Sequence, residues 1–214
     1  MKHFKTLLAA FVIFTTPLMA QDSTQGKVNY IVTMNLHANL KPDQLQYKDA
    51  LPEFIDREIV FLFKGKHGLI KSIETASEGS EVEVKVKIGN EDGVTYVDMD
   101  AKKNLQLINV DGKQFLHKGD TKKVEDVKEV ETGETKNILG YACKKVISKN
   151  GKDKTTYWYT TTLPILGGAF GIMSGKGLIL ELESPLFSFK AKSLQFEKIA
   201  DADVLPPKGV KEAE

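Results

Sequence analysis

Alternation of apolar and charged residues over short stretches constrains the fold of this chain more than any other feature. In the clearest stretch, residues 81–88, valine and isoleucine alternate with glutamate and lysine. Successive side chains of a strand point to opposite faces, so this pattern predicts a strand with one buried and one solvated face. Similar patterns predict strands at 27–35, 58–64, 69–75, 94–98, 105–110, 113–117, 141–148, 155–161, 178–183 and 187–198.

The turns between these stretches are typical of hairpins. Asp111-Gly112 and Asn150-Gly151 suit the two central positions of a tight hairpin turn, where both residues adopt positive φ. Short turns between consecutive strands predict an antiparallel meander. With Asn150-Gly151 at the centre of its turn, Cys143 would lie opposite Trp158, and Tyr157 and Tyr159 would share the other face.

The segment 42–57 departs from the strand pattern. It opens with Pro42-Asp43, a helix start signal, and its apolar residues recur at near-helical spacing, at Leu45, Leu51, Phe54 and Ile55. Pro52 would split it into two short helices or end the first. We therefore predict a mainly β (α+β) fold, a curved antiparallel sheet or half-barrel with a short helical crossover packed on its concave side.

The two ends of the chain differ from its middle. Lys2 and Lys5 lead into an apolar run at 7–14, and Ala20 precedes a polar stretch, which is the pattern of a secretory signal peptide. The run is far shorter than the ~20 residues that span a bilayer, so a membrane anchor is only the alternative. We expect a signal peptide at 1–20, cleaved after Ala20, one half-barrel domain at 21–200 and a disordered tail at 201–214. The product would be periplasmic or secreted.

The charge and the cysteine content of the chain limit the classes of partner and the means of stabilisation that it can have. The chain has 30 basic and 29 acidic residues, and loss of Lys2 and Lys5 would leave 28 against 29, a net charge of −1. A chain so close to neutral is not steered toward nucleic acid or an anionic membrane. The single cysteine, Cys143, cannot form an internal disulfide, so stability must come from the core.

Motifs of the common catalytic mechanisms are missing from the sequence. There is no HExxH zinc motif, no GxSxG nucleophile motif and no phosphate-binding loop, and the histidines His37, His67 and His117 are scattered. Cys143 could serve as a nucleophile beside a distant histidine, but a cysteine in a strand is more typically a small buried hydrophobe. We therefore predict no catalytic residue, no metal site, no cofactor and no enzymatic activity.

A glycine-rich segment at 163–182 does not fit a plain pattern of strands and turns. Its five glycines separate apolar residues that would be costly to leave in water. It is either a tight passage of backbone across the sheet or a mobile lid over an apolar cavity. The residues that would line such a cavity are Phe170, Ile172, Met173, Leu178, Phe54 and Trp158.

The stretch 140–183 resembles the GLPGLI family of exported Bacteroidetes proteins of unknown function, or a sister family. The resemblance is carried by GYACKK at 140–145, Trp158-Tyr159-Thr160, Leu163-Pro164 and GKGLILELE at 175–183. Lys176 stands where that family has proline, which is a departure from its namesake motif. Such families are similar to the lipoprotein-carrier superfold, a half-barrel whose concave face holds acyl chains. The resemblance implies a hydrophobic or lipid ligand, and it carries over no catalytic residue.

Three functions are open from the sequence. The first is an exported, soluble, non-catalytic protein that binds a lipid or another hydrophobic ligand in the cell envelope. The second is an envelope structural or protein-interaction module, with the charged stretch 121–136 contacting a partner protein. The third is an enzyme that uses Cys143 or a pair of carboxylates such as Asp98 and Asp100. Neither a nucleic-acid partner nor a membrane-spanning segment after signal cleavage is expected.

Overall fold

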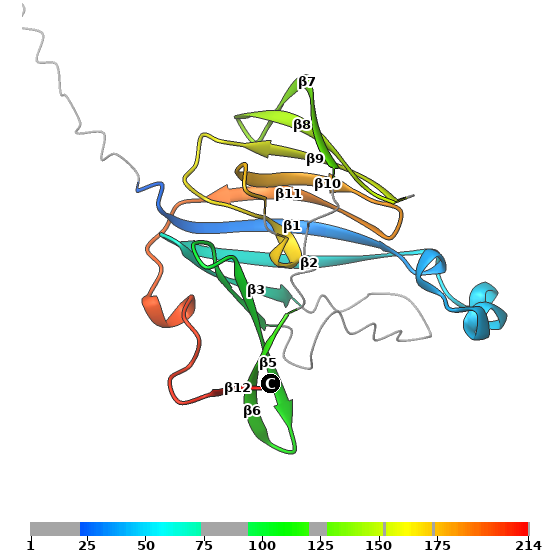
Figure 1. The fold of residues 1–214 in the computed structure, drawn as a ribbon, viewed down its shortest axis with the longest axis horizontal. Helices are drawn as coiled ribbons and strands as arrows, with labels where there is room; N and C mark the ends of the chain where they lie inside the picture. The colour runs from blue at the N-terminus through cyan, green and yellow to red at the C-terminus, as the bar shows by residue number, and fades with distance from the viewer. Residues whose placement is uncertain (1–21, 74–93, 120–127, 152, 173, 214) are drawn as a thin grey trace, which may run out of the picture.

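The computed structural model describes residues 22–73, 94–119, 128–151, 153–172 and 174–213. Within these ranges, one 12-stranded sheet has the order β12-β6-β5-β4-β3-β2-β1-β11-β10-β9-β8-β7. Neighbouring strands are antiparallel, except for β12 and β6, which run parallel. Figure 1 shows the sheet as a curved and twisted layer. The strands are β1 (Gln25–Asn35), β2 (Phe54–Lys64), β3 (His67–Ile73), β4 (Val94–Asp98), β5 (Lys103–Val110), β6 (Lys113–Lys118), β7 (Lys128–Ile138), β8 (Tyr141–Asn150), β9 (Asp153–Thr160), β10 (Leu178–Glu183), β11 (Phe187–Gln195) and β12 (Lys211–Ala213); the short 3-10 helices are η1 (His37–Asn39), η2 (Pro42–Ala50), η4 (Ala169–Gly171) and η5 (Asp201–Asp203).

Strand β1 lies inside the sheet and shows how its two faces differ. Val28, Tyr30 and Val32 are buried on one face, which we call the inner face, while the residues between them are half-buried on the outer face. The Tyr30 hydroxyl donates to the carbonyl oxygen of Ile179 at 2.9 Å, so this fully buried polar group has a partner. The Tyr30 ring meets Phe189 edge-on, with 5.3 Å between the ring centroids.

The inner face is covered by the connection between β9 and β10. A single sheet cannot bury an apolar face without a second layer. Residues 161–177, which we call the β9–β10 loop, supply that layer, because Leu163, Ile165 and Ala169 belong to the same buried cluster as the β1 side chains. Figure 1 shows η4 of this loop lying in front of β1 and β2. The glycine-rich segment is therefore a packed cover of the core and not a lid over an empty cavity.

The β5–β6 turn has the predicted register. Val110 pairs with Lys113, which leaves Asp111 and Gly112 as the two central residues. Both have positive φ, of 54° and 76°, as a tight hairpin turn of this kind requires.

The β8–β9 turn differs from its predicted register by two residues. Asn150 pairs with Asp153, so the central pair of the turn begins at Gly151. Trp158 consequently lies opposite Lys145, and the predicted pairing of Trp158 with Cys143 is wrong. Because side chains alternate with a period of two, the shift leaves each side chain on its predicted face.

The segment from 201 onward, expected as a disordered tail, has defined structure up to residue 213. It contains η5, and its last strand, β12, pairs with β6. Ile199 and Val204 pack with Leu69 in a second buried cluster, and Leu69 points to the outer face because Ile70 beside it belongs to the core cluster. These two apolar residues anchor a segment whose composition is otherwise typical of a tail.

The helical crossover does not pack on the concave side. None of the residues of η2 is buried, and Figure 1 shows it projecting beyond the ends of β1 and β2. Leu45 and Tyr47 are 54% and 57% exposed. A short, mostly polar helix offers no continuous apolar stripe to hold it against a sheet, and the β9–β10 loop already covers the inner face.

The predicted mainly β fold with a curved sheet and little helix is confirmed. The strand predicted at 81–88 and the signal peptide predicted at 1–20 lie outside the described residues, as do residues 120–127 of the charged stretch. Among the residues that the structure describes, no helix is long and apolar enough to cross a membrane.

A cavity-forming substitution tests the packing of the C-terminal segment. Val204 is 2% exposed, so Val204→Ala should lower the free energy of unfolding by about 1–2 kcal/mol. The neighbouring Leu205 is 38% exposed, so Leu205→Ala should change it by less than about 0.5 kcal/mol. Urea unfolding measures both. Equal effects of the two substitutions would contradict the placement of this segment on the sheet.

Candidate functional site

Two tyrosines of β9 and two glutamates of β7 meet on the inner face at the β7 edge of the sheet. Tyr157 and Tyr159 share this face, with their ring centroids 6.2 Å apart. The Tyr157 hydroxyl donates to Glu129 at 2.8 Å, and the Tyr159 hydroxyl donates to Glu131 Oε1 at 2.5 Å. Strand β8 lies between them, and its fully buried Val146 pairs with Tyr157 on one side and with Glu131 on the other. The tyrosines therefore reach across one whole strand.

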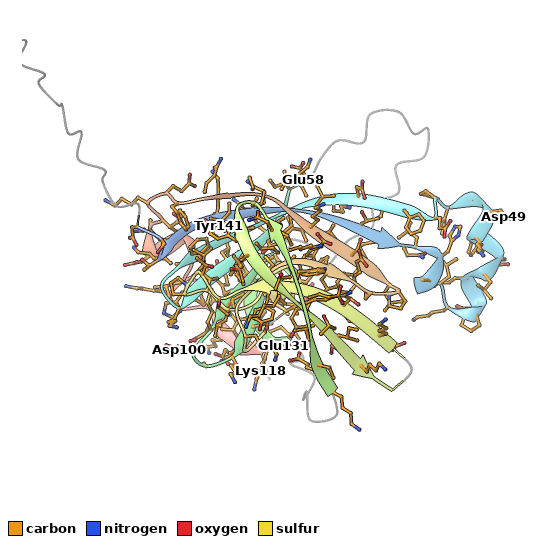
Figure 2. All side chains as sticks on the ribbon, turned by 90° about the horizontal axis from the view of Figure 1, so that it is seen from above. Asp49, Glu58, Asp100, Lys118, Glu131 and Tyr141 are labelled. Atoms are coloured by element: carbon orange, nitrogen blue, oxygen red, sulfur yellow. The ribbon has the colours of Figure 1, made fainter. Side chains whose placement is uncertain are left out.

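Ser174 and Lys176 of the β9–β10 loop complete this group. We call Glu129, Glu131, Tyr157, Tyr159, Ser174 and Lys176 the acid–tyrosine cluster. Ser174 is 5% exposed, its side-chain oxygen accepts a hydrogen bond from the backbone N–H of Lys176 at 3.1 Å, and its nearby hydroxyl acts to lower the pKa of Tyr157. Lys176 Nζ lies 3.3 Å from Glu131 Oε1. Figure 2 shows Glu131 and Glu58 on opposite sides of the ribbon, as their places on the two faces require.

Hydrogen bonds and burial fix the protonation of this cluster. The hydrogen bond from Tyr159, followed by that from Lys176, holds the pKa of Glu131 below its ordinary value. Burial, followed by the hydrogen bond to Glu131, raises the pKa of Tyr159 to about 12. Burial and the hydrogen bond to Glu129 likewise raise the pKa of Tyr157. Near neutral pH the cluster thus holds an ionised Glu131 and two protonated phenols, a fixed set of acceptors and donors that suits a polar ligand.

The cluster does not have the make-up of a metal site. Within the described ranges, no group of three or more histidine, cysteine, aspartate or glutamate residues could hold a metal ion. Its carboxylates are instead partnered by hydroxyl and ammonium donors.

Trp158, expected to line a cavity, lies on the outer face among charged residues. Lys136 Nζ is 4.3 Å and Lys145 Nζ is 5.6 Å from the centroid of its ring. Lys136 pairs with Glu181 at 2.5 Å, and Lys145 pairs with Glu134 at 2.9 Å. The indole is therefore part of a cross-strand ladder that ties β7, β8, β9 and β10 together.

Of the other residues expected to line the cavity, Leu178, Phe170 and Ile172 meet in the buried cluster of the inner face, whereas Phe54 lies away from it. Leu178 is fully buried in the core. Phe170 and Ile172 pack against that core from the loop. Phe54 is 54% exposed at the start of β2, and Met173 lies outside the described residues. The apolar side chains of the loop thus fill the inner face themselves.

The groups considered for a catalytic role hold structural positions. Cys143 is fully buried, and burial raises the pKa of its thiol, which disfavours the nucleophilic thiolate. Asp98 accepts hydrogen bonds from the backbone N–H groups of Asp100 and Ala101, at 3.0 Å and 2.9 Å, and so stabilises the turn after β4.

The sequence alone does not predict the acid–tyrosine cluster. Alternation places Tyr157 and Tyr159 on one face of their strand, and the same alternation places Glu129 and Glu131 on one face of theirs. What alternation cannot supply is the pairing of β7 with β8, which brings the glutamates within reach of the tyrosines.

Comparison with known proteins identifies related domains. A family model described as "N-glycanase peptide, N-terminal domain" matches residues 70–205. The structure of PNGF-II in the C2 space group is 16% identical with a TM-score of 0.58, over 89% of this chain and 31% of that chain. The structure of PNGF-II in the P21 space group is 18% identical with a TM-score of 0.54, over 83% of this chain and 29% of that chain. This chain spans less than a third of those chains. A comparison with curated proteins finds no match.

These matches overturn the resemblance to the GLPGLI family and to the lipoprotein-carrier superfold. The family model relates the chain to an N-glycanase N-terminal domain instead, and the two solved structures share its fold. The resemblance depended on short stretches, GYACKK and GKGLILELE, that lie in or next to strands of the core. Such stretches reflect packing needs that unrelated β proteins share. The lipid ligand implied by the resemblance is withdrawn with it.

Titration of Tyr159 tests the hydrogen bonds of the cluster. The difference in phenolate absorbance between the wild type and Tyr159→Phe should rise near pH 12, above the ordinary value of about 10. Glu131→Gln should move that transition to lower pH, because it removes the carboxylate charge beside the phenol. Since the pKa is raised on folding, its contribution to stability is present below pH ~10 and lost as the pH rises toward 12. A Tyr159 transition near pH 10 in the wild type would contradict the geometry.

Proposed function

This chain belongs to the family of N-glycanase N-terminal domains, and we propose that it binds the carbohydrate of N-glycosylated peptides through its acid–tyrosine cluster. The cluster is the observation that carries the proposal. A glycan presents mainly hydroxyl groups, and a carboxylate with fixed neighbouring donors can accept hydrogen bonds from them. The family relationship supports a glycan-related role, and the polar chemistry of the cluster supports this class of ligand.

Glu131 supports the proposal in more detail. Both of its contacts, with Tyr159 and with Lys176, use Oε1. Among the residues that the structure describes, none donates a hydrogen bond to its Oε2 atom. Those lone pairs are available to sugar hydroxyl groups, while Tyr159 and Lys176 hold the carboxylate in place. Because the side chain of Glu131 is exposed, such a ligand needs no opening of the core.

Hydrolysis of the glycan–asparagine bond is the second candidate function. Two observations favour it. Two glutamates lie on one face beside phenolic donors, and the chain matches the N-glycanase N-terminal domain family. A general acid, however, needs a raised pKa, whereas the pKa of Glu131 is lowered by its hydrogen bonds with Tyr159 and Lys176. The chain also spans less than a third of the PNGF-II chains that it resembles in fold. Binding is therefore the first candidate, and the expectation of a non-catalytic protein remains a prediction.

Export is part of the same proposal. A signal peptide at 1–20 would bring the protein to a periplasmic or extracellular place. Soluble N-glycosylated peptides and proteins would be accessible to it there.

Titration with a glycopeptide tests the binding function. A peptide with an asparagine-linked chitobiose should bind the purified protein, and the same peptide without the sugar should not. Glu131→Gln should weaken the affinity about tenfold, because hydrogen bonds to a charged group contribute about 1.5–3 kcal/mol. Isothermal titration calorimetry measures the dissociation constants.

Glu134→Gln is the matched control for this titration. Glu134 lies on the same strand, but it pairs with Lys145 beside Trp158 on the outer face. Its substitution should leave the affinity unchanged within about twofold. Equal binding of the two peptides, or equal weakening by Glu131→Gln and Glu134→Gln, would refute a carbohydrate site at the cluster.

Mass spectrometry of the same glycopeptide distinguishes the two candidate functions. If the protein only binds, the glycopeptide should keep its mass after prolonged incubation. Release of the chitobiose by the wild type, together with loss of release in Glu129→Gln, would replace the binding function with hydrolysis.

A further inference from the structure

The β9–β10 loop contacts two distant parts of the sheet. Near its middle, η4 lies against β2, β3 and β4. Near its end, Ser174 and Lys176 join the acid–tyrosine cluster at the β7 edge. In the strand order, β4 and β7 lie on opposite sides of the central strand β1. The placement of η4 is therefore one of two constraints on Ser174 and Lys176, the other being the backbone hydrogen bond from Gly167 to the carbonyl oxygen of Gly177 at 3.1 Å.

Asn104 of β5 holds η4 through a single side-chain contact. Its Nδ2 atom donates a hydrogen bond to the carbonyl oxygen of Gly171 at 2.7 Å. Its Oδ1 atom is buried and has no hydrogen-bond partner among the described residues. The side-chain amide of Asn104 therefore donates its hydrogen bond to the loop and not to its own strand.

The backbone at η4 has an unusual conformation that lets Gly171 come close to Asn104. Phe170 has a φ of 61°, which is in the left-handed region that non-glycine residues seldom adopt. Gly171 follows with a φ of 68°, and a Cβ atom there would lie 2.7 Å from Asn104 Nδ2. The Phe170 ring is seated edge-on against Phe187, with 5.2 Å between the centroids. These contacts select one arrangement of the loop, and Ser174 follows Gly171 closely along the chain.

We propose that Asn104 is a positioning residue for the acid–tyrosine cluster, because it fixes the loop that brings Ser174 and Lys176 onto Tyr157 and Glu131. Asn104 touches neither glutamate and acts only through the loop. The expected effect on ligand affinity rests on the proposed carbohydrate binding. The expected effect on the pKa of Glu131 in the unliganded protein does not rest on it.

Substitution of Asn104 should change the ionisation of Glu131. Asn104→Leu keeps a similar shape and removes the donor, so Lys176 should lose its fixed place beside Glu131. The charged and titratable neighbours of that carboxyl are Tyr159, Lys176, Lys144 and, through Tyr159, Glu129. Loss of the Lys176 contact should raise the pKa of Glu131, as measured by carbon-13 NMR titration of the side-chain carboxyl. Affinity for the chitobiose glycopeptide should fall about tenfold.

Gly171→Ala disrupts the same contact from the loop side, so it should also raise the pKa of Glu131 and weaken the affinity for the glycopeptide. Two matched controls separate positioning from general loss of stability. Asn109→Leu changes an asparagine on the same strand that is exposed near the β5–β6 turn. Gly175→Ala changes a glycine of the same loop whose added Cβ would meet nothing within 4 Å. Both controls should leave the titration of Glu131 unchanged.

A double substitution shows whether the effect passes through Lys176. Lys176→Met should itself raise the pKa of Glu131, and Asn104→Leu in that background should raise it no further. An unchanged Glu131 titration in folded Asn104→Leu, or full additivity of the two substitutions, would overturn the positioning role. Glycopeptide that fails to bind the wild type would refute the proposed function alone, because the Glu131 titration is read without ligand.

Discussion

The packing of the β9–β10 loop on the inner face is the contact on which the rest of this structure depends. The sheet has one layer, and among the described helices only the three-residue η4, itself part of this loop, lies on its apolar face. Leu163, Ile165 and Ala169 cover it from the loop, and the glycines allow the backbone to come close. A Cβ on Gly177, for example, would lie 2.2 Å from the carbonyl oxygen of Thr160. The same loop places Ser174 and Lys176 at the edge of the sheet, so the segment that covers the core also completes the acid–tyrosine cluster.

Local alternation predicts most of the strands, because the two faces of a half-buried strand are written in its own residues. It also predicts which side chains share a face, even where the register is off, as at Trp158 and Cys143. The helix and the tail were less predictable, because their placement depends on surfaces far away in the sequence. Leu45 and Val204 are both aliphatic residues in mostly polar segments, yet Leu45 is exposed and Val204 is buried. Only the packing of the folded chain distinguishes them.

The candidate site depends on pairings that no single strand encodes. Tyr159 and Glu131 meet only because β7 and β9 flank β8 in the sheet. The apolar residues of the loop suggested a cavity, because a sequence shows that such residues must be buried but does not show what they pack against. In the structure they pack on the inner face and cover it themselves. The family relationship was likewise not visible in short motifs. The family model matches over residues 70–205, and the two solved structures share only 16% and 18% sequence identity with this chain.

The place of Trp158 has an optical consequence. It is the sole tryptophan of the chain, so the long-wavelength intrinsic fluorescence of the protein comes from one indole. That indole lies on the outer face with Lys136 over its ring, while the tyrosines of the acid–tyrosine cluster lie on the inner face of the same strand. Its emission therefore reports on the ladder that joins β7 to β10. A spectral change would reveal strain passed through the sheet and not direct contact with a molecule seated on the opposite face.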